Sequence, residues 1–246
     1  MNTNSLRFEG RQVLVVGGSS GIGNGIAQAF RAAGATVHVW GTRASPADYR
    51  AEDGSDLTGL QYHRVDAADA NSVAAFSPPF DRLDALVLSQ GIVEYKRAEF
   101  QLDVFQRVVE VNLNSVMRCC STFHPQLKAA GGAVVIVSSV SGLKAQIGNP
   151  AYGASKAGAI SLTKSLGAAY AADGIRVNGI APGLVDTKLT KATTGHPGRL
   201  AATLQRIPAG RMGTPQDMAN VALFLASPLA AYIVGHTITV DGGLSA

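Results

Sequence analysis

Three side chains in the middle of the sequence have the types and spacing needed to transfer a proton. Tyr152 is followed four positions later by Lys156 in the segment AYGASKAGA, and Ser139 stands at the end of the apolar run AVVIVSS. Residues i and i+4 share one face of a helix, so the lysine ammonium would favour the phenolate and lower the pKa of Tyr152 from its ordinary value of ~10. Such a tyrosine can exchange a proton with a carbonyl or alcohol oxygen, and the Ser139 hydroxyl could hydrogen-bond that oxygen.

A glycine-rich segment near the N-terminus is typical of a dinucleotide site. The apolar residues 13–16 run directly into GGSSGIG (17–23), and a helical pattern follows. A new helix offers unpaired N–H groups and the positive end of its dipole, and glycines let the backbone approach a pyrophosphate. The spacing Gly17-x-x-x-Gly21-x-Gly23 differs from the strict G-x-G-x-x-G fingerprint, so a tight turn needed only for packing is the alternative interpretation.

The end of the second apolar run indicates which dinucleotide would bind. No Asp or Glu occurs from position 24 through 47, where a carboxylate for the ribose 2′-hydroxyl would be expected, and Thr42 and Arg43 follow the run. A guanidinium there suits a 2′-phosphate. The sequence therefore favours NADP(H), with NAD(H) possible if Arg43 points to solvent instead.

These residues must be positioned by a sheet. Short apolar runs alternate with longer segments of helical period, which predicts an α/β fold: a Rossmann-like doubly wound parallel sheet of about seven strands with helices on both faces. The expected strands are 12–17, 36–41, 60–65, 85–89, 133–138, 175–181 and 236–241. The expected helices are 22–34, 71–76, 102–130, 150–173 and 214–227, the last with Thr214 as N-cap before Pro215.

The organisation along the chain predicts one NAD(P)-binding domain over residues 1–246. No low-complexity linker divides the sequence. The irregular stretch 188–213 is expected to form a substrate loop, and a plain surface loop with one short helix is the alternative.

Composition excludes several other classes of protein. Of 246 residues, 46% are hydrophobic and 15% charged, which argues against disorder, and the net charge of +4 comes without a dense basic run, so nucleic acid is not an expected partner. No apolar run reaches the ~18 residues of a membrane span, and the N-terminus lacks a signal-peptide core. The two cysteines are adjacent, and the five histidines show no ligand spacing, so we expect a cytoplasmic protein with no metal and no membrane partner.

Taken together, the motifs resemble the short-chain dehydrogenase/reductase family in its short single-domain subtype, and the resemblance covers essentially the whole chain. The family's glycine motif matches residues 16–23, its active-site Asn, Ser, Tyr and Lys match Asn112, Ser139, Tyr152 and Lys156, and RVNGIAPGLVDT and Asp241-Gly242-Gly243 match its later elements. Two positions depart from the family pattern: Val16 replaces a threonine, and Leu88-Ser89-Gln90-Gly91 replaces Asn-Asn-Ala-Gly, where Ser89 or Gln90 would supply substitute hydrogen bonds.

The resemblance implies roles for individual residues. Lys156 would also hold the nicotinamide ribose, Asn112 would anchor a water in a proton relay, Val185 and Thr187 would fix the carboxamide, and Asp66 would contact the adenine amino group. The residues expected to bind the cofactor are Gly17, Ser19, Ser20, Gly21, Ile22, Gly23, Thr42, Arg43, Asp66, Ala67, Ser89, Gly91, Tyr152, Lys156, Pro182, Gly183, Val185 and Thr187.

The expected activity is an NADP(H)-dependent transfer of hydride between nicotinamide and a carbonyl or secondary alcohol, with Tyr152 as acid or base. The alternatives are an NAD(H)-dependent alcohol or polyol dehydrogenase and a non-catalytic nucleotide-binding regulatory protein. Within the family, the chain resembles members similar to 3-oxoacyl-acyl-carrier-protein reductase. Asp173 weakens the case for a carrier-protein substrate, because an acidic residue would repel an acidic carrier protein. Small-molecule substrates such as thioesters, sugars, polyols and ketones therefore stay open. The family also implies a homotetramer or homodimer. The substrate pocket is expected to include Ile92, Val93, Glu94, Gln146 and Ile147.

Overall fold

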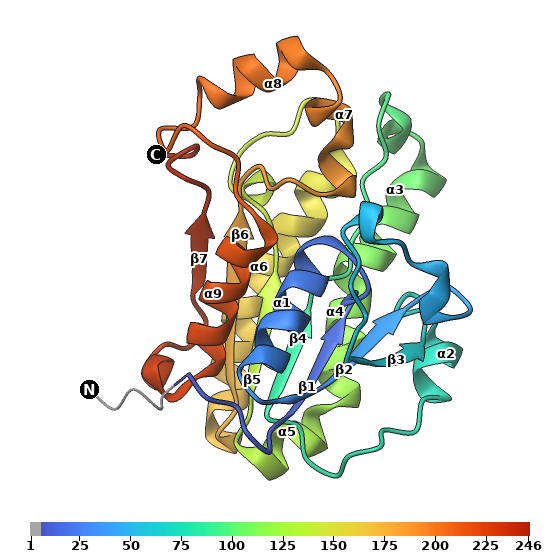
Figure 1. Cartoon of the computed structure of the whole chain (residues 1–246), viewed down its shortest axis with the longest axis vertical. Helices are drawn as coiled ribbons and strands as arrows, with labels where there is room; N and C mark the ends of the chain where they lie inside the picture. Colours follow the sequence, from blue (N-terminus) through green and yellow to red (C-terminus); the bar gives the residue numbers. More distant parts are fainter. Residues whose placement is uncertain (1–5) are drawn as a thin grey trace.

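The computed structural model describes residues 6–246, and its centre is a parallel sheet (Figure 1). Seven strands take the order β3-β2-β1-β4-β5-β6-β7, and every neighbouring pair is parallel. This confirms the predicted doubly wound Rossmann-like fold. The strands are β1 (Gln12–Val16), β2 (Thr36–Gly41), β3 (Gln61–Arg64), β4 (Ala85–Leu88), β5 (Ala133–Val137), β6 (Arg176–Pro182) and β7 (Thr237–Val240).

Both faces of the sheet are covered by helices, which explains why its central strands are apolar throughout. In β1, Val13 and Val15 belong to one buried cluster while Leu14 and Val16 belong to the other. The first cluster packs against α1 (Gly21–Ala32) and α9 (Pro215–Ala226), and the second against α2 (Ala70–Ala74) and α6 (Pro150–Tyr170). Successive strand side chains point to opposite faces, so only a sheet buried on both sides selects apolar residues at every position.

The expected single helix over 102–130 is wrong. The segment forms α3 (Leu102–Val109), a π-helical turn (Glu110–Asn114), α4 (Ser115–Thr122) and α5 (His124–Ala130). The second break has a local cause, since Pro125 stands in the first turn of α5, where its missing N–H costs nothing. The π turn places Asn112 in the interior, and such turns are frequent at functional sites.

Segment 188–213 is more ordered than expected. It holds a 3-10 turn (Lys188–Thr190) and two short helices, α7 (Lys191–Thr194) and α8 (Pro197–Leu204). These lie beyond the carboxyl ends of the strands (Figure 1). The strand order reverses between β1 and β4, so the crevice at that point of the same edge is where this kind of sheet binds ligands.

Candidate active site

A cavity of about 610 Å³ opens at this edge of the sheet and gathers most of the predicted site residues. It extends from the glycine loop after β1 to Ser139, Tyr152 and Lys156. Of the expected cofactor residues, those lining it are Gly17, Ser19, Ser20, Gly21, Ile22, Gly23, Thr42, Asp66, Ala67, Ser89, Gly91, Tyr152, Lys156, Pro182, Gly183, Val185 and Thr187. Arg43 and Asn112 are not among the lining residues.

The glycine loop has the geometry of an anion cradle. Gly17 has a φ of +74°, and a β-carbon there would lie 2.8 Å from the backbone nitrogen of Gln90, so only glycine fits. The helix that follows, α1, has no acidic residue in its first turn, and the side chain of its N-cap, Ser20, makes no capping hydrogen bond. The positive end of α1 therefore faces the cavity without a protein carboxylate, as a phosphate site requires.

Ser139, Tyr152 and Lys156 converge from two elements. Ser139 follows β5, and its hydroxyl accepts a hydrogen bond from the Ser141 N–H at 3.1 Å, which fixes the start of the next turn. Tyr152 is the third residue of α6, and the Nζ of Lys156, one turn later, lies 5.8 Å from the centroid of the phenol ring. Lys156 is buried, and its Nζ donates to the Val137 carbonyl at 3.0 Å.

The pKa of Tyr152 differs from the value expected from its spacing to Lys156. Burial raises the pKa of Tyr152 above its ordinary value, and only a hydrogen bond with Ser139 opposes this. Burial also lowers the pKa of Lys156, to about 8. The predicted lowering of the tyrosine pKa by Lys156 is therefore not observed in the protein alone, because burial penalises the charged forms of both groups.

Asn112 acts on the loop after β4. It is fully buried in the π turn, where its Oδ1 accepts from the Ile92 N–H at 2.8 Å and its Nδ2 donates to the Ile92 carbonyl at 2.9 Å. A β-carbon on Gly91 would lie 3.4 Å from both Asn112 Oδ1 and Lys156 Nζ, so the three groups meet closely. Asn112 thus fixes the loop that passes over Lys156, and its role as a water anchor stays a prediction.

Arg43 lies outside the cavity wall. Its guanidinium stacks over the Tyr49 ring, 4.6 Å from the centroid, and donates to the Asp48 carbonyl. Thr42 and Asp66 do reach the cavity at this end. Contact between Arg43 and a 2′-phosphate would need the guanidinium to turn from Tyr49, so this role stays a prediction.

The departures from the family pattern have visible consequences. The Gln90 side chain donates to the Ser115 hydroxyl at 2.9 Å, which ties the end of β4 to α4 rather than to the glycine loop. The backbone supplies the link to β1, because the Ser89 N–H donates to the Val16 carbonyl at 3.0 Å. Gln90 therefore supplies a side-chain hydrogen bond of its own, whereas the Ser89 bond is a main-chain contact that any residue other than proline could make at this position.

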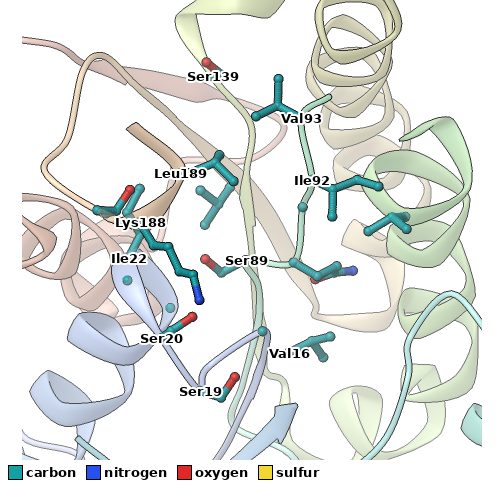
Figure 2. A pocket seen from close by; sticks show the side chains of 18 of the residues that line it. Val16, Ser19, Ser20, Ile22, Ser89, Ile92, Val93, Ser139, Lys188 and Leu189 are labelled. Atoms are coloured by element: carbon teal, nitrogen blue, oxygen red, sulfur yellow. The ribbon is translucent and has the colours of Figure 1, made fainter. Parts of the chain in front are cut away.

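The first residues of the expected substrate loop form the roof of the cavity. Lys188, Leu189 and Thr190 line the cavity, and Figure 2 shows the Lys188 side chain extending inward toward Ser20. The local signal of this turn is the pair Thr187 and Thr190: the Thr190 hydroxyl accepts from the Thr187 N–H at 3.1 Å and donates to the Val185 carbonyl at 2.7 Å. Of the expected substrate-pocket residues, Ile92 and Val93 line the cavity, whereas Glu94, Gln146 and Ile147 do not. The side chain of Ile147 is 86% exposed.

Comparison with known proteins agrees with this geometry. Residues 16–245 match the family model described as enoyl-(acyl carrier protein) reductase. The chain belongs to the short-chain dehydrogenase/reductase family. It is an oxidoreductase of this family, in the class acting on alcohol or carbonyl groups.

Individual relatives span nearly the whole chain. The chain is 37% identical to a 3-oxoacyl-(acyl-carrier-protein) reductase of Chlamydia muridarum, over 96% of this chain and 97% of that protein. It is 40% identical to cis-4-hydroxycyclohexanecarboxylate dehydrogenase of Sinomonas cyclohexanicum, over 97% and 98%. A crystal structure with bound NADP, of an Agrobacterium tumefaciens protein assigned as a 2-deoxy-D-gluconate 3-dehydrogenase, has a TM-score of 0.86 and 37% identity, over 98% and 99%.

Two other kinds of site are absent from the part of the chain that the structure describes. Within residues 6–246, no cluster of three His, Cys, Asp or Glu side chains is arranged to hold a metal ion. None of the helices described is both long and apolar enough to cross a membrane.

Proposed function

We propose that the protein is an NADP(H)-dependent oxidoreductase that interconverts a carbonyl and a secondary alcohol at this cavity. The observation that carries the proposal is that one cavity joins the anion cradle at α1 to Ser139, Tyr152 and Lys156. A regulatory nucleotide-binding protein has no need of a buried lysine beside a tyrosine and a strand-end serine. NADP(H) is favoured over NAD(H) by the bound NADP of the Agrobacterium structure and by Arg43 near the end of β2.

The cavity fits a dinucleotide along its length. The amino end of α1 would hold the pyrophosphate with Lys188, which brings a positive charge from the opposite wall. Asp66 and Thr42 would hold the adenosine end, and Val185 and Thr187 the nicotinamide end.

The chain's own residues would perform the proton transfer. When bound, the cofactor supplies or takes the hydride at the substrate carbon. The Tyr152 phenol would donate its proton to the carbonyl oxygen during reduction and accept it back from the alcohol during oxidation. The Ser139 hydroxyl would hydrogen-bond the same oxygen, and the Lys156 ammonium would stabilise the phenolate left after donation.

The substrate end favours a small molecule with apolar carbon next to the reacting oxygen. Val93, Tyr95 and Leu189 line the cavity together with Ser139. The alicyclic and sugar-acid substrates named for two relatives match this size class.

We propose further that the chain is one nucleotide-binding domain working in the cytoplasm as a homotetramer or homodimer. Its two buried cysteines are free thiols, which fits a reducing compartment.

The test is titration followed by turnover. NADPH and NADH are titrated by nicotinamide fluorescence, and turnover is then followed with acetoacetyl-coenzyme A, 4-oxocyclohexanecarboxylate, cis-4-hydroxycyclohexanecarboxylate and 2-deoxy-D-gluconate. We expect tighter binding of NADPH and turnover of at least one compound. NADPH binding without any turnover would support the regulatory alternative, and absence of binding would refute both.

A further inference from the structure

The amino end of α6 is capped by a carboxylate from a distant segment. α6 has no acidic residue in its first turn, and its N-cap, Asn149, makes no side-chain capping hydrogen bond. Instead, Glu99 Oε2 accepts a hydrogen bond from the Tyr152 N–H at 2.9 Å. The first N–H groups of a helix have no intrahelical partner, so Glu99 satisfies this need at the residue that carries the phenol.

Glu99 is placed as a charge. Its side chain is only 1% exposed, and its other oxygen accepts from the Glu94 N–H at 3.0 Å. Both partners are N–H donors, which is the arrangement an ionised carboxylate accepts. The positive end of the α6 dipole favours a negative charge at this point. Burying a carboxylate is costly, so packing alone does not account for a glutamate here.

The segment that presents Glu99 is held from several sides. Lys96 and Arg97 have φ values of 58° and 62°, in the left-handed region that residues with a β-carbon rarely adopt. The 3-10 turn Ala98–Phe100, which carries the buried Glu99, begins directly after these two residues. The Asn149 side chain donates to the Glu94 carbonyl at 2.7 Å, and the Tyr95 hydroxyl donates to the Leu189 carbonyl at 2.7 Å. The segment 94–99 therefore links the cavity roof to the start of α6, through Tyr95 at one end and Glu99 at the other.

Four groups face the Tyr152 phenol from the elements around it. Lys156 comes from α6, Tyr95 and Glu99 come from the segment before α3, and the Ser139 hydroxyl follows β5. Burial is the main cause of the raised pKa of Tyr152, and Tyr95 and Glu99 raise it further. Ser139 acts in the opposite direction.

We propose that Glu99 is a positioning residue. Its carboxylate fixes Tyr152 at the amino end of α6, and its negative charge acts on the phenol in the opposite direction to the Lys156 ammonium. The inference rests on the proposed acid–base role of Tyr152. The charge keeps the phenol protonated to higher pH, which favours proton donation in reduction. Alcohol oxidation, in which Tyr152 must accept a proton, then requires higher pH.

The positioning part is tested by amide hydrogen exchange, which needs no substrate. Glu99→Gln should speed exchange at the Tyr152 amide by about tenfold, because an amide side chain cannot accept from both N–H groups. Asp103→Asn, the same change on an exposed residue of α3, should leave this exchange unchanged. Unchanged exchange in Glu99→Gln would overturn the proposal. Should that variant be insoluble, Glu99→Asp carries the same measurement, because the shorter side chain loses its reach.

The charge part is tested by the pH dependence of NADP⁺-linked oxidation of cis-4-hydroxycyclohexanecarboxylate or 2-deoxy-D-gluconate. In Glu99→Gln the acid limb of kcat/KM should move down by about one pH unit, because a nearby like charge is removed. Glu99→Asp keeps the charge and should lose kcat about tenfold without this downward shift. An unmoved limb in Glu99→Gln contradicts the proposal. A wild-type protein inactive with every substrate refutes the proposed function instead, and hydrogen exchange then decides the positioning role alone.

Discussion

The Nζ of Lys156 lies 5.8 Å from the centroid of the Tyr152 ring, and both side chains are held at the wall of the same cavity. The lysine is anchored by the Val137 carbonyl at the end of β5, so the pair spans α6 and the sheet. Burial opposes the charged form of each group, which makes the pair sensitive to any charge brought beside it.

Tyr152→Phe removes the proton donor and little else. We expect kcat to fall by at least about a thousandfold, since acid–base groups contribute up to four orders of magnitude. NADPH affinity, measured by fluorescence titration, should stay close to that of the wild type, because the phenol is not needed to hold the phosphates. A variant retaining most of its turnover would contradict the proposed mechanism.

Ser139→Ala tests the hydrogen bond to the reacting oxygen. We expect kcat to fall about a hundredfold, the usual effect of losing one such donor. Ser139 also begins the turn at Val140–Gly142, so the thermal unfolding temperature should be measured in parallel. Ser141→Ala, two residues further on and outside the cavity wall, is the matched control. Equal losses of kcat in the two variants would show that the turn, rather than the hydroxyl, matters.

Lys188→Met tests the positive charge on the cavity roof. Loss of a charge-assisted contact to phosphate should raise the dissociation constant of the dinucleotide about tenfold. The pyrophosphate is common to both dinucleotides, so NADPH and NADH should weaken alike, whereas Arg43→Ala should weaken NADPH alone. Lys191→Met, on the exposed side of the same segment, should change neither constant. Unchanged affinities in Lys188→Met would exclude it from the phosphate site.

The contact between buried His38 and half-buried His63 predicts acid sensitivity. The rings meet at 3.0 Å between Nδ1 and Nε2, and burial, aided by His63, lowers the pKa of His38 to about 4. The unfolded chain, with a pKa of ~6.5, binds the proton more tightly, so stability is complete above pH 6.5 and falls as the pH drops toward 4.

From this single group, we expect the free energy of unfolding in urea to fall by about 2 kcal/mol between pH 7 and 5. His38→Leu should remove that part of the loss. If the variant lost as much stability as the wild type over this range, the acid sensitivity would have to come from other groups.

The sequence alone determined the features that depend on neighbours along the chain. Strands apolar at every position predict a sheet covered on both faces, and the glycine loop before α1 predicts an anion site, because both follow from local geometry. The spacing of Tyr152 and Lys156 predicts their shared helix face for the same reason. Even the roof turn had a local signal in Thr187 and Thr190.

Tertiary structure decided what depends on burial and on contacts between distant segments. The partner of Asn112 in the π turn is Ile92, 20 residues away, which it holds through two hydrogen bonds. The cap on α6 comes from Glu99, 53 residues before Tyr152. The raised pKa of Tyr152 comes from burial, which no spacing encodes. Side-chain charge and reach are written in the sequence, but the water they lose and the partners they meet are fixed only when the sheet brings separate segments to one edge.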